Sequence, residues 1–366
     1  MRRFRFPALL LAALATGCAP RVVDQPAAGP PAVDHVDMTW LSIANMHFAL
    51  GDQHVLADGY ITRLPAENFY GGGGGYASTR RPMVSDINAV REVLDALGGA
   101  AAVKLLITGH SHWDHTFDTA SWAKLSGAPV IGSSTTCLQV RAGGIPGERC
   151  TAVYGGEKIT IVPGVDMHVI RWNHSGNSAQ NPEQHDPVEL HDVPTPDAAG
   201  GLRAGVAEDF PNGGGNRAYL FSVHGARGQR FSWLYQDSAS AVDLRDPVKV
   251  DGRDYGAPLD NLRAAMRAAG LESVDLWIAT GGSEVAELVL PVINPKNYLP
   301  VHWDGLFDPF KAGPPRPFFD PRLAALLRER GVNLIVPRQY MDSWRLDATG
   351  VHALDNTAVQ SRLGFK

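Results

Sequence analysis

The sequence has few cysteines, no long apolar run and no surplus of basic residues. Three cysteines among 366 residues exclude a small scaffold held together mainly by disulfides. No apolar run approaches the roughly 20 residues that a membrane-spanning helix needs. A formal net charge of −5 indicates no nucleic-acid partner. No internal repeat is present. With 44% hydrophobic residues, the chain can bury a large core, as one large domain or two smaller ones.

The first 18 residues have the pattern of an export signal. Three arginines precede a short apolar run, and small residues then lead to Cys18. Small residues before a cysteine resemble a bacterial lipoprotein cleavage site, which implies that Cys18 becomes the lipidated first residue; an ordinary secretory signal is the alternative. We expect an exported, periplasm-facing protein anchored to a membrane through Cys18. Because Ala19 follows the cysteine, the resemblance favours the outer membrane. Residues 19–37 are rich in Pro, Ala and Val and predict a flexible tether.

The most distinctive stretch is Gly-His-Ser-His-Trp-Asp-His at residues 109–115, directly after a β-branched apolar run that predicts a buried strand. In an extended segment, residues two apart point the same way, so His110 and His112 can reach one metal ion. Asp114 and His115 then face a second position. Imidazole nitrogen and carboxylate oxygen are ligands of zinc and similar divalent ions, with manganese and iron also suited. A chance cluster on a solvated loop is the alternative.

Three further candidate ligands each follow the end of a predicted strand: His174, Asp237 and His302. In layered α/β folds, ligands gather outside the carboxyl ends of strands, because the loops there converge on one crevice. The seven candidates form two sets around a shared Asp237: His110, His112 and His174 for one metal, and Asp114, His115 and His302 for the other.

Strand and helix patterns alternate along the chain, which predicts an α/β layered fold. Strands are expected at 39–48, 54–62, 103–108, 129–132, 151–172, 217–223, 231–235, 274–280 and 332–336, and helices at 83–97, 116–125, 259–269 and 321–330. Residues 50–53 predict a hairpin between the first two strands.

These residues resemble the metallo-β-lactamase superfamily. Its HxHxDH motif is matched in full by His110, His112, Asp114 and His115. Its later His, its bridging Asp and its last His match His174, Asp237 and His302. Its hairpin Asp, which has a supporting role in the family, matches Asp58. The resemblance implies an αββα sandwich, two mixed sheets flanked by helices, with the site at one edge. Residues 299–303 are most similar to ascorbate-6-phosphate lactonase-like and N-acylphosphatidylethanolamine phospholipase D-like members.

We expect a metallo-β-lactamase-like domain over 38–345 and a C-terminal extension over 346–366. Within the domain, residues 177–215 are polar, rich in Pro and Gly and without periodicity, which predicts an inserted loop that covers the site and sets specificity. Four of its residues could bind metal, but a solvated patch fits better because seven ligands already fill two sites; they are His185, Glu189, His191 and Asp192. The glycine-rich stretch 70–76 predicts a mobile loop. Cys137 and Cys150 form either a disulfide or two buried thiols.

A dinuclear site predicts hydrolysis. Two divalent ions hold a water between them and lower its pKa, and the resulting hydroxide attacks a carbonyl or phosphorus. By resemblance, the catalytic Asp114 binds the second metal and orients that water or accepts its proton, while Asp237 bridges both ions. An ester, lactone or phosphodiester bond in a small-molecule or lipid substrate is expected, and protein partners stay unknown.

Three alternatives are left open. A β-lactamase-type amide hydrolase is less favoured, because variants with this histidine-rich motif generally lack the bridging carboxylate seen here as Asp237. Di-iron oxidoreductases of the superfamily carry a glutamate where this chain has His112. A non-catalytic metal-binding lipoprotein is expected to have lost at least one ligand, and none is missing here.

Overall fold

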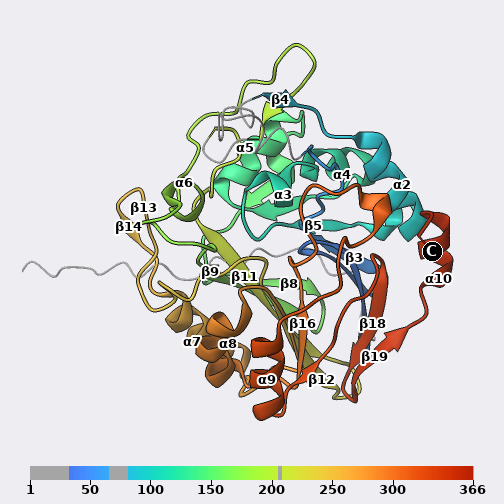
Figure 1. Ribbon diagram of the computed structural model, residues 1–366, viewed down its shortest axis with the longest axis vertical. Helices are drawn as coiled ribbons and strands as arrows, with labels where there is room; N and C mark the ends of the chain where they lie inside the picture. Colours follow the sequence, from blue (N-terminus) through green and yellow to red (C-terminus); the bar gives the residue numbers. More distant parts are fainter. Residues whose placement is uncertain (1–32, 66–80, 205–207, 366) are drawn as a thin grey trace, which may run out of the picture.

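The computed structural model describes residues 33–65, 81–204 and 208–365. Within these residues, two large β-sheets pack face to face and helices cover their outer sides (Figure 1). The expected export signal, most of the expected tether and the glycine-rich stretch 70–76 lie outside the described residues. Among the described residues, no helix has the length and apolar character to cross a membrane.

The first sheet has eight strands in the order β19-β18-β1-β2-β3-β5-β6-β7. It is mixed, because β3, β5, β6 and β7 run parallel and the other neighbours pair antiparallel. Its strands are β1 (His35–Ser42), β2 (Asn45–Leu50), β3 (Gln53–Ala57), β5 (Leu105–Ile107), β6 (Val130–Gly132), β7 (Cys150–Ala152), β18 (Asp342–Asp347) and β19 (Gly350–Leu354).

The second sheet has seven strands in the order β17-β16-β15-β12-β11-β9-β8, also mixed. They are β8 (Lys158–Val162), β9 (Val165–Trp172), β11 (Asn216–His224), β12 (Arg230–Tyr235), β15 (Leu276–Ala279), β16 (Asn297–Pro300) and β17 (Asn333–Leu334). Two small ribbons pair β4 (Pro82–Met83) with β10 (Leu202–Arg203), and β13 (Lys249–Val250) with β14 (Arg253–Asp254).

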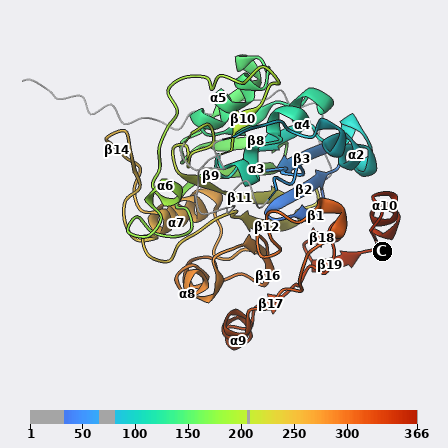
Figure 2. The same cartoon turned by 45° about the horizontal axis from the view of Figure 1, so that its top comes forward.

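The helices form an outer layer on each side (Figure 2). Those on the first sheet's side are α2 (Ile87–Leu97), α3 (Trp113–Thr116), α4 (Thr119–Ser126) and α5 (Ser134–Ala142), and those on the second sheet's side are α7 (Pro258–Ala269), α8 (Gly282–Ile293) and α9 (Pro321–Glu329). The remaining ones are α6 (Pro182–His185), α10 (Thr357–Arg362) and the 3₁₀ turns η2 (Ala100–Ala102), η3 (Gly147–Arg149) and η4 (Phe310–Ala312).

Strand β11 shows why two cores form. Successive side chains of a strand point to opposite faces. Tyr219 and Phe221 accordingly pack between the sheets, while Ala218 and Leu220 belong to the core beneath α7, α8 and α9. Burying one large apolar side chain stabilises a fold by about 1.5–3 kcal/mol, so both faces of this strand hold layers together. The predicted sandwich of two mixed sheets flanked by helices is confirmed.

Locally, the structure differs from the expected elements at one strand and adds one helix. The expected strand 39–48 is broken at Ile43, whose φ of 50° reverses the chain between β1 and β2. Helix α5 was not predicted, because its buried positions include Thr135, Thr136 and Gln139 rather than an apolar stripe. The expected boundary positions 37 and 345 lie within β1 and β18, which pair with each other in the first sheet, and the division into domain and extension stays a prediction.

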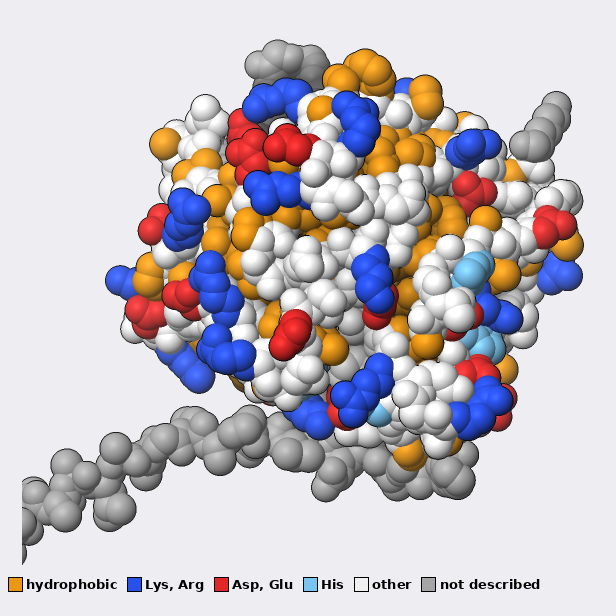
Figure 3. Space-filling model, turned by 90° about the horizontal axis from the view of Figure 1, so that it is seen from below, with side chains coloured by type: hydrophobic (Ala, Val, Ile, Leu, Met, Phe, Trp, Pro, Cys, Tyr) orange, Lys and Arg blue, Asp and Glu red, His pale blue; other side chains and the backbone are white. Residues whose placement is uncertain are grey.

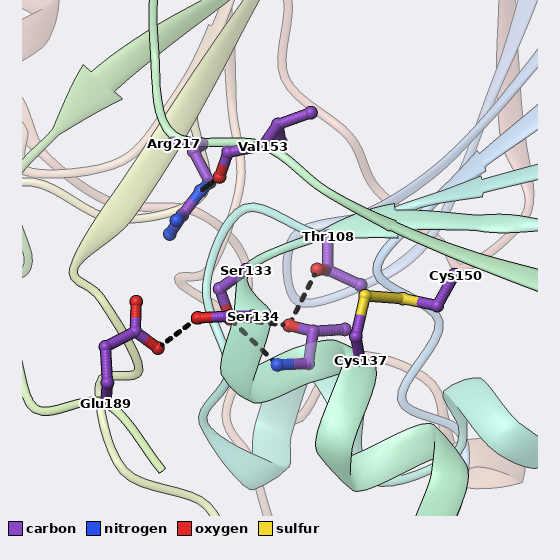
Figure 4. Close-up of a disulfide and its surroundings, with 9 residues drawn as sticks. Thr108, Ser133, Ser134, Cys137, Cys150, Val153, Glu189 and Arg217 are labelled. Atoms are coloured by element: carbon purple, nitrogen blue, oxygen red, sulfur yellow. Dashed lines mark hydrogen bonds between the residues drawn. A yellow bond between two sulfur atoms is a disulfide. The ribbon is translucent and has the colours of Figure 1, made fainter. Parts of the chain in front are cut away.

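Within the insertion 177–215, the structure describes helix α6 and strand β10. Glu189 Oε2 accepts hydrogen bonds from the hydroxyls of Ser134 and Thr135, both 2.7 Å away. In Figure 4 this contact lies near the disulfide that joins Cys137 to Cys150. The insertion is therefore attached to helix α5, which the disulfide in turn ties to β7.

The surface seen from below carries acidic and basic side chains interspersed with each other (Figure 3). Among the described residues, this view shows no broad patch of one sign.

Candidate metal centre

The ends of five strands, three in the second sheet and two in the first, bring the predicted residues together. Strands β9, β12, β15 and β16 all point the same way, because β9 and β12 each pair antiparallel with β11, and β12, β15 and β16 pair parallel. Their carboxyl ends therefore share one sheet edge. His174 follows β9, Asp237 follows β12 and His302 follows β16. In the facing sheet, Asp58 follows β3 and the 109–115 stretch follows β5.

Three histidines form the first group. Within hydrogen-bond distance, His112 Nδ1 lies 3.1 Å from His110 Nε2 and 3.1 Å from His174 Nε2. Three ring nitrogens that all carry lone pairs cannot hydrogen-bond to one another, because none of them donates a proton. One cation, however, can accept the lone pairs of all three. Burial, opposed by Asp114 and reinforced by nearby histidines, lowers the pKa of His112 to about 4. Burial and neighbouring rings also hold the pKa values of His110 and His174 well below the usual range. All three are neutral near pH 7, the form that binds metal.

Asp114, His115 and His302 form the second group. Asp114 Oδ2 is 3.4 Å from His115 Nε2 and 3.2 Å from His302 Nε2. Burial alone would raise the pKa of Asp114, but His115 and His302 hold it well below its usual range. Burial would likewise lower the pKa of His115, yet Asp114 and Asp58 raise it well above 6.5. Without a cation, a proton on His115 balances these carboxylates.

Asp237 lies between the two groups. Its Oδ2 is 2.8 Å from His110 Nδ1 and 3.3 Å from His115 Nδ1, so it touches one histidine of each set. Its Oδ1 is buried and has no hydrogen-bond partner in the described part of the chain. Burial and the neighbouring Asp58 raise the pKa of Asp237 to about 8. A nearby cation would reverse that shift, because it favours the charged carboxylate.

Asp58 supports the centre from β3. Its Oδ2 accepts hydrogen bonds from His115 Nδ1 at 2.8 Å and from the Tyr235 hydroxyl at 2.6 Å, and its Oδ1 accepts from the Gly109 backbone N–H at 3.0 Å. A carboxylate on the far nitrogen of an imidazole fixes its tautomer and orientation. The structure thus places Asp58 in the supporting position that the resemblance implies.

Two supports were not found by sequence reasoning. His302 has a left-handed backbone, with φ of 63°, and its N–H donates to the Ile43 carbonyl at 2.9 Å. The Ile43 N–H donates in turn to the buried Asp304 carboxylate, at 3.1 and 3.0 Å. The break in the first predicted strand therefore holds the His302 loop. The second support is Gly109, where an added Cβ would overlap the Asp237 carboxylate. In the sequence, the only sign of this close approach is the glycine directly before the histidine motif.

The donor atoms of these groups fit bound metal. Besides Asp237 Oδ1, the buried His115 Nε2 has no hydrogen-bond partner in the described residues, although it faces Asp114. Buried polar atoms are seldom left without partners, so atoms of these types in one cluster indicate a ligand. The donor set of imidazoles and carboxylates suits zinc, and manganese or iron also.

The insertion takes no direct part in these groups. Among the described residues, the candidate metal-binding groups contain none of its four titratable candidates. His185 instead donates to Asp243, with Nε2 2.7 Å from Oδ2. Burial would lower the pKa of His185, but the bond to Asp243 raises it.

The fold and the cluster together describe an α/β sandwich with candidate metal-binding groups at one sheet edge. No protein-family model matches the chain. The chain is similar to a "UPF0173 metal-dependent hydrolase" of Pyrobaculum arsenaticum, 33% identical over 78 residues, which are 21% of this chain and 34% of that protein. A second such hydrolase, from Pyrobaculum calidifontis, is 32% identical over 81 residues, 22% of this chain and 36% of that one. The chain therefore matches about a third of the length of these relatives.

Among solved structures, the chain is similar to Igni18, described as a novel metallo hydrolase from Ignicoccus hospitalis. The two share 12% identity with a TM-score of 0.47, over 86% of this chain and 99% of that one.

Proposed function

We propose that this chain is a metal-dependent hydrolase with a dinuclear centre, zinc being the ion that fits best. The observation that carries the proposal is the pairing of two three-residue groups around Asp237, whose Oδ1 is buried and without a hydrogen-bond partner in the described residues. The printed name of the Pyrobaculum relatives, metal-dependent hydrolase, agrees with it.

A bound pair of divalent ions supplies a water of lowered pKa and stabilises the charge that develops on the substrate oxygen. The chain's own residues arrange this. The three imidazoles of the first group are neutral, so a metal ion could bind their lone pairs without first displacing a proton. Asp114, held ionised by His115 and His302, orients the attacking water or accepts its proton. An ester, lactone or phosphodiester bond is the proposed target.

Asp237→Ala tests the centre. Removing the carboxylate between the groups should lower the metal content of the purified protein and reduce hydrolysis at least about 100-fold, more than the loss of a supporting residue causes. Metal content is measured by elemental analysis, and close to two metals per wild-type chain are expected. His224→Ala, an exposed position at the end of β11, should change neither quantity. A wild-type chain that binds no metal would contradict the proposal.

The substrate class is tested on lactones, bis-p-nitrophenyl phosphate, phospholipids and nitrocefin. Metal-dependent turnover of a lactone or phosphodiester is the expected result. Turnover of nitrocefin alone would instead support a β-lactamase-type amide hydrolase. Two bound metals without turnover of any compound would support a non-catalytic metal-binding protein.

A further inference from the structure

A carbonyl oxygen next to His174 receives two histidine hydrogen bonds. His174 turns Nε2 toward His112 of the first group. Its Nδ1 donates to the Ser175 carbonyl oxygen at 2.9 Å. The same oxygen accepts a bond from His185 Nδ1, 3.1 Å away, which comes from the insertion. The position of this carbonyl sets the direction of the His174 ring, because the ring must donate to it in order to keep Nε2 unprotonated.

The second nitrogen of His185 is also held. His185 Nε2 lies 2.7 Å from Asp243 Oδ2, and Asp243 Oδ1 accepts from Asn173 Nδ2 at 2.6 Å. Asn173 directly precedes His174, so the bonds close a ring that starts and ends beside the candidate ligand. Both nitrogens of His185 face acceptors, hence both donate. The His185 side chain is buried, with 5% of the residue exposed, so water competes little for these bonds.

The ring is joined to the loop that carries Asp237. The Ser175 N–H donates to Ser238 Oγ at 3.0 Å, and Asn173 Nδ2 donates to the Ser240 carbonyl at 2.7 Å. Ser240 Oγ donates to the Gly176 carbonyl at 2.6 Å. Two segments that present candidate ligands are thus fixed to each other, and the insertion supplies the residue that closes the arrangement.

We infer that His185, backed by Asp243, is a positioning residue for the metal centre: it orients the Ser175 carbonyl and through it the His174 ring. This inference rests on the proposed function, since it needs a metal at the first group. The insertion then has a role in assembling the centre, beyond covering it.

Two substitutions separate the hydrogen bond that matters from the loss of the imidazole. Asn places its amide nitrogen where His185 Nδ1 lies and keeps the donor to Ser175, whereas Gln places it near Nε2 and keeps only the donor to Asp243. His185→Gln should weaken zinc affinity, measured by competition with a chelator, by about 10–100-fold, the range for supporting partners of metal-bound histidines. His185→Asn should stay within about threefold of wild type. The visible spectrum of the cobalt-substituted protein should shift for His185→Gln only.

The melting temperatures of the metal-free variants check that both fold. Equal zinc affinity for His185→Gln and wild type would overturn the inference, and so would an equal loss for His185→Asn and His185→Gln. Failure of the proposed function is distinguishable, because wild-type protein would then bind no zinc.

Discussion

At the scale of single residues, the candidate centre is a balance of buried charges. The carboxylates of Asp58, Asp114 and Asp237 are all buried. Each of them lies next to the His115 ring. Burying a carboxylate costs several kcal/mol unless a cation or proton is near. In the metal-free chain, protons on His115 and Asp237 supply that compensation, since the pKa values of both are raised. Metal binding must displace these protons.

Zinc affinity should therefore rise with pH. The sign follows from the raised pKa of Asp237, which is about 8. At pH values below this pKa, protons compete with the metal for the carboxylate. Each displaced proton changes the zinc affinity about tenfold per pH unit. Calorimetric titration between pH 6 and 9, in buffers of different ionisation enthalpy, measures both affinity and proton release. Asp237→Asn should give a shallower pH dependence. An affinity independent of pH over this range would contradict the assignment.

At the scale of elements, the turn between β1 and β2 and the loop after β16 lock together. The Ile43 N–H donates to Asp304, which lies 261 positions later in the chain. The His302 N–H donates to the Ile43 carbonyl. These bonds hold His302 in a left-handed conformation, which costs a non-glycine residue of order 1–2 kcal/mol. The arrangement persists because the surrounding structure determines it.

Asp304→Ala should lower the free energy of unfolding of the metal-free protein by about 2–3 kcal/mol, because it leaves the buried Ile43 N–H without its charged acceptor. The second metal should be bound more weakly than the first, since His302 loses its anchor. Urea unfolding and metal stoichiometry measure the two effects. Asp308→Ala, at an exposed position in the same loop, should stay within about 0.5 kcal/mol of wild type. Unchanged metal stoichiometry in Asp304→Ala would refute the link to His302.

At the scale of the whole molecule, the centre exists only when both sheets are packed. Its groups draw on β3, β5, β9, β12 and β16, so each sheet contributes candidate ligands or supports. The chain ahead of β1 adds a second whole-molecule feature, and we propose that it exports the protein and anchors it through Cys18.

Cys18→Ala should abolish incorporation of labelled fatty acid and move the protein from the membrane fraction to the soluble fraction, because a lipid chain is the proposed attachment. Ala19→Asp should remain lipidated but shift between membranes, as the resemblance to bacterial lipoproteins implies. Fractionation with labelled palmitate measures both. If Cys18→Ala stays in the membrane fraction as wild type does, the anchor lies elsewhere.

The sequence alone determined the alternation of strands and helices, the two-sheet sandwich and the residues that the structure gathers into one cluster. The alternation follows from local periodicity, and His110 to His115 are recognised from their short spacing. His174, Asp237 and His302 are recognised because each follows the end of a predicted strand, and the two-sheet sandwich is implied by the resemblance to the metallo-β-lactamase superfamily. Tertiary structure alone decided that Ile43 breaks a strand, that Asp304 anchors the His302 loop and that His185 supports the Ser175 carbonyl. Each depends on contacts between residues far apart in sequence or on a backbone conformation imposed by packing, and neither leaves a periodic signal in the chain.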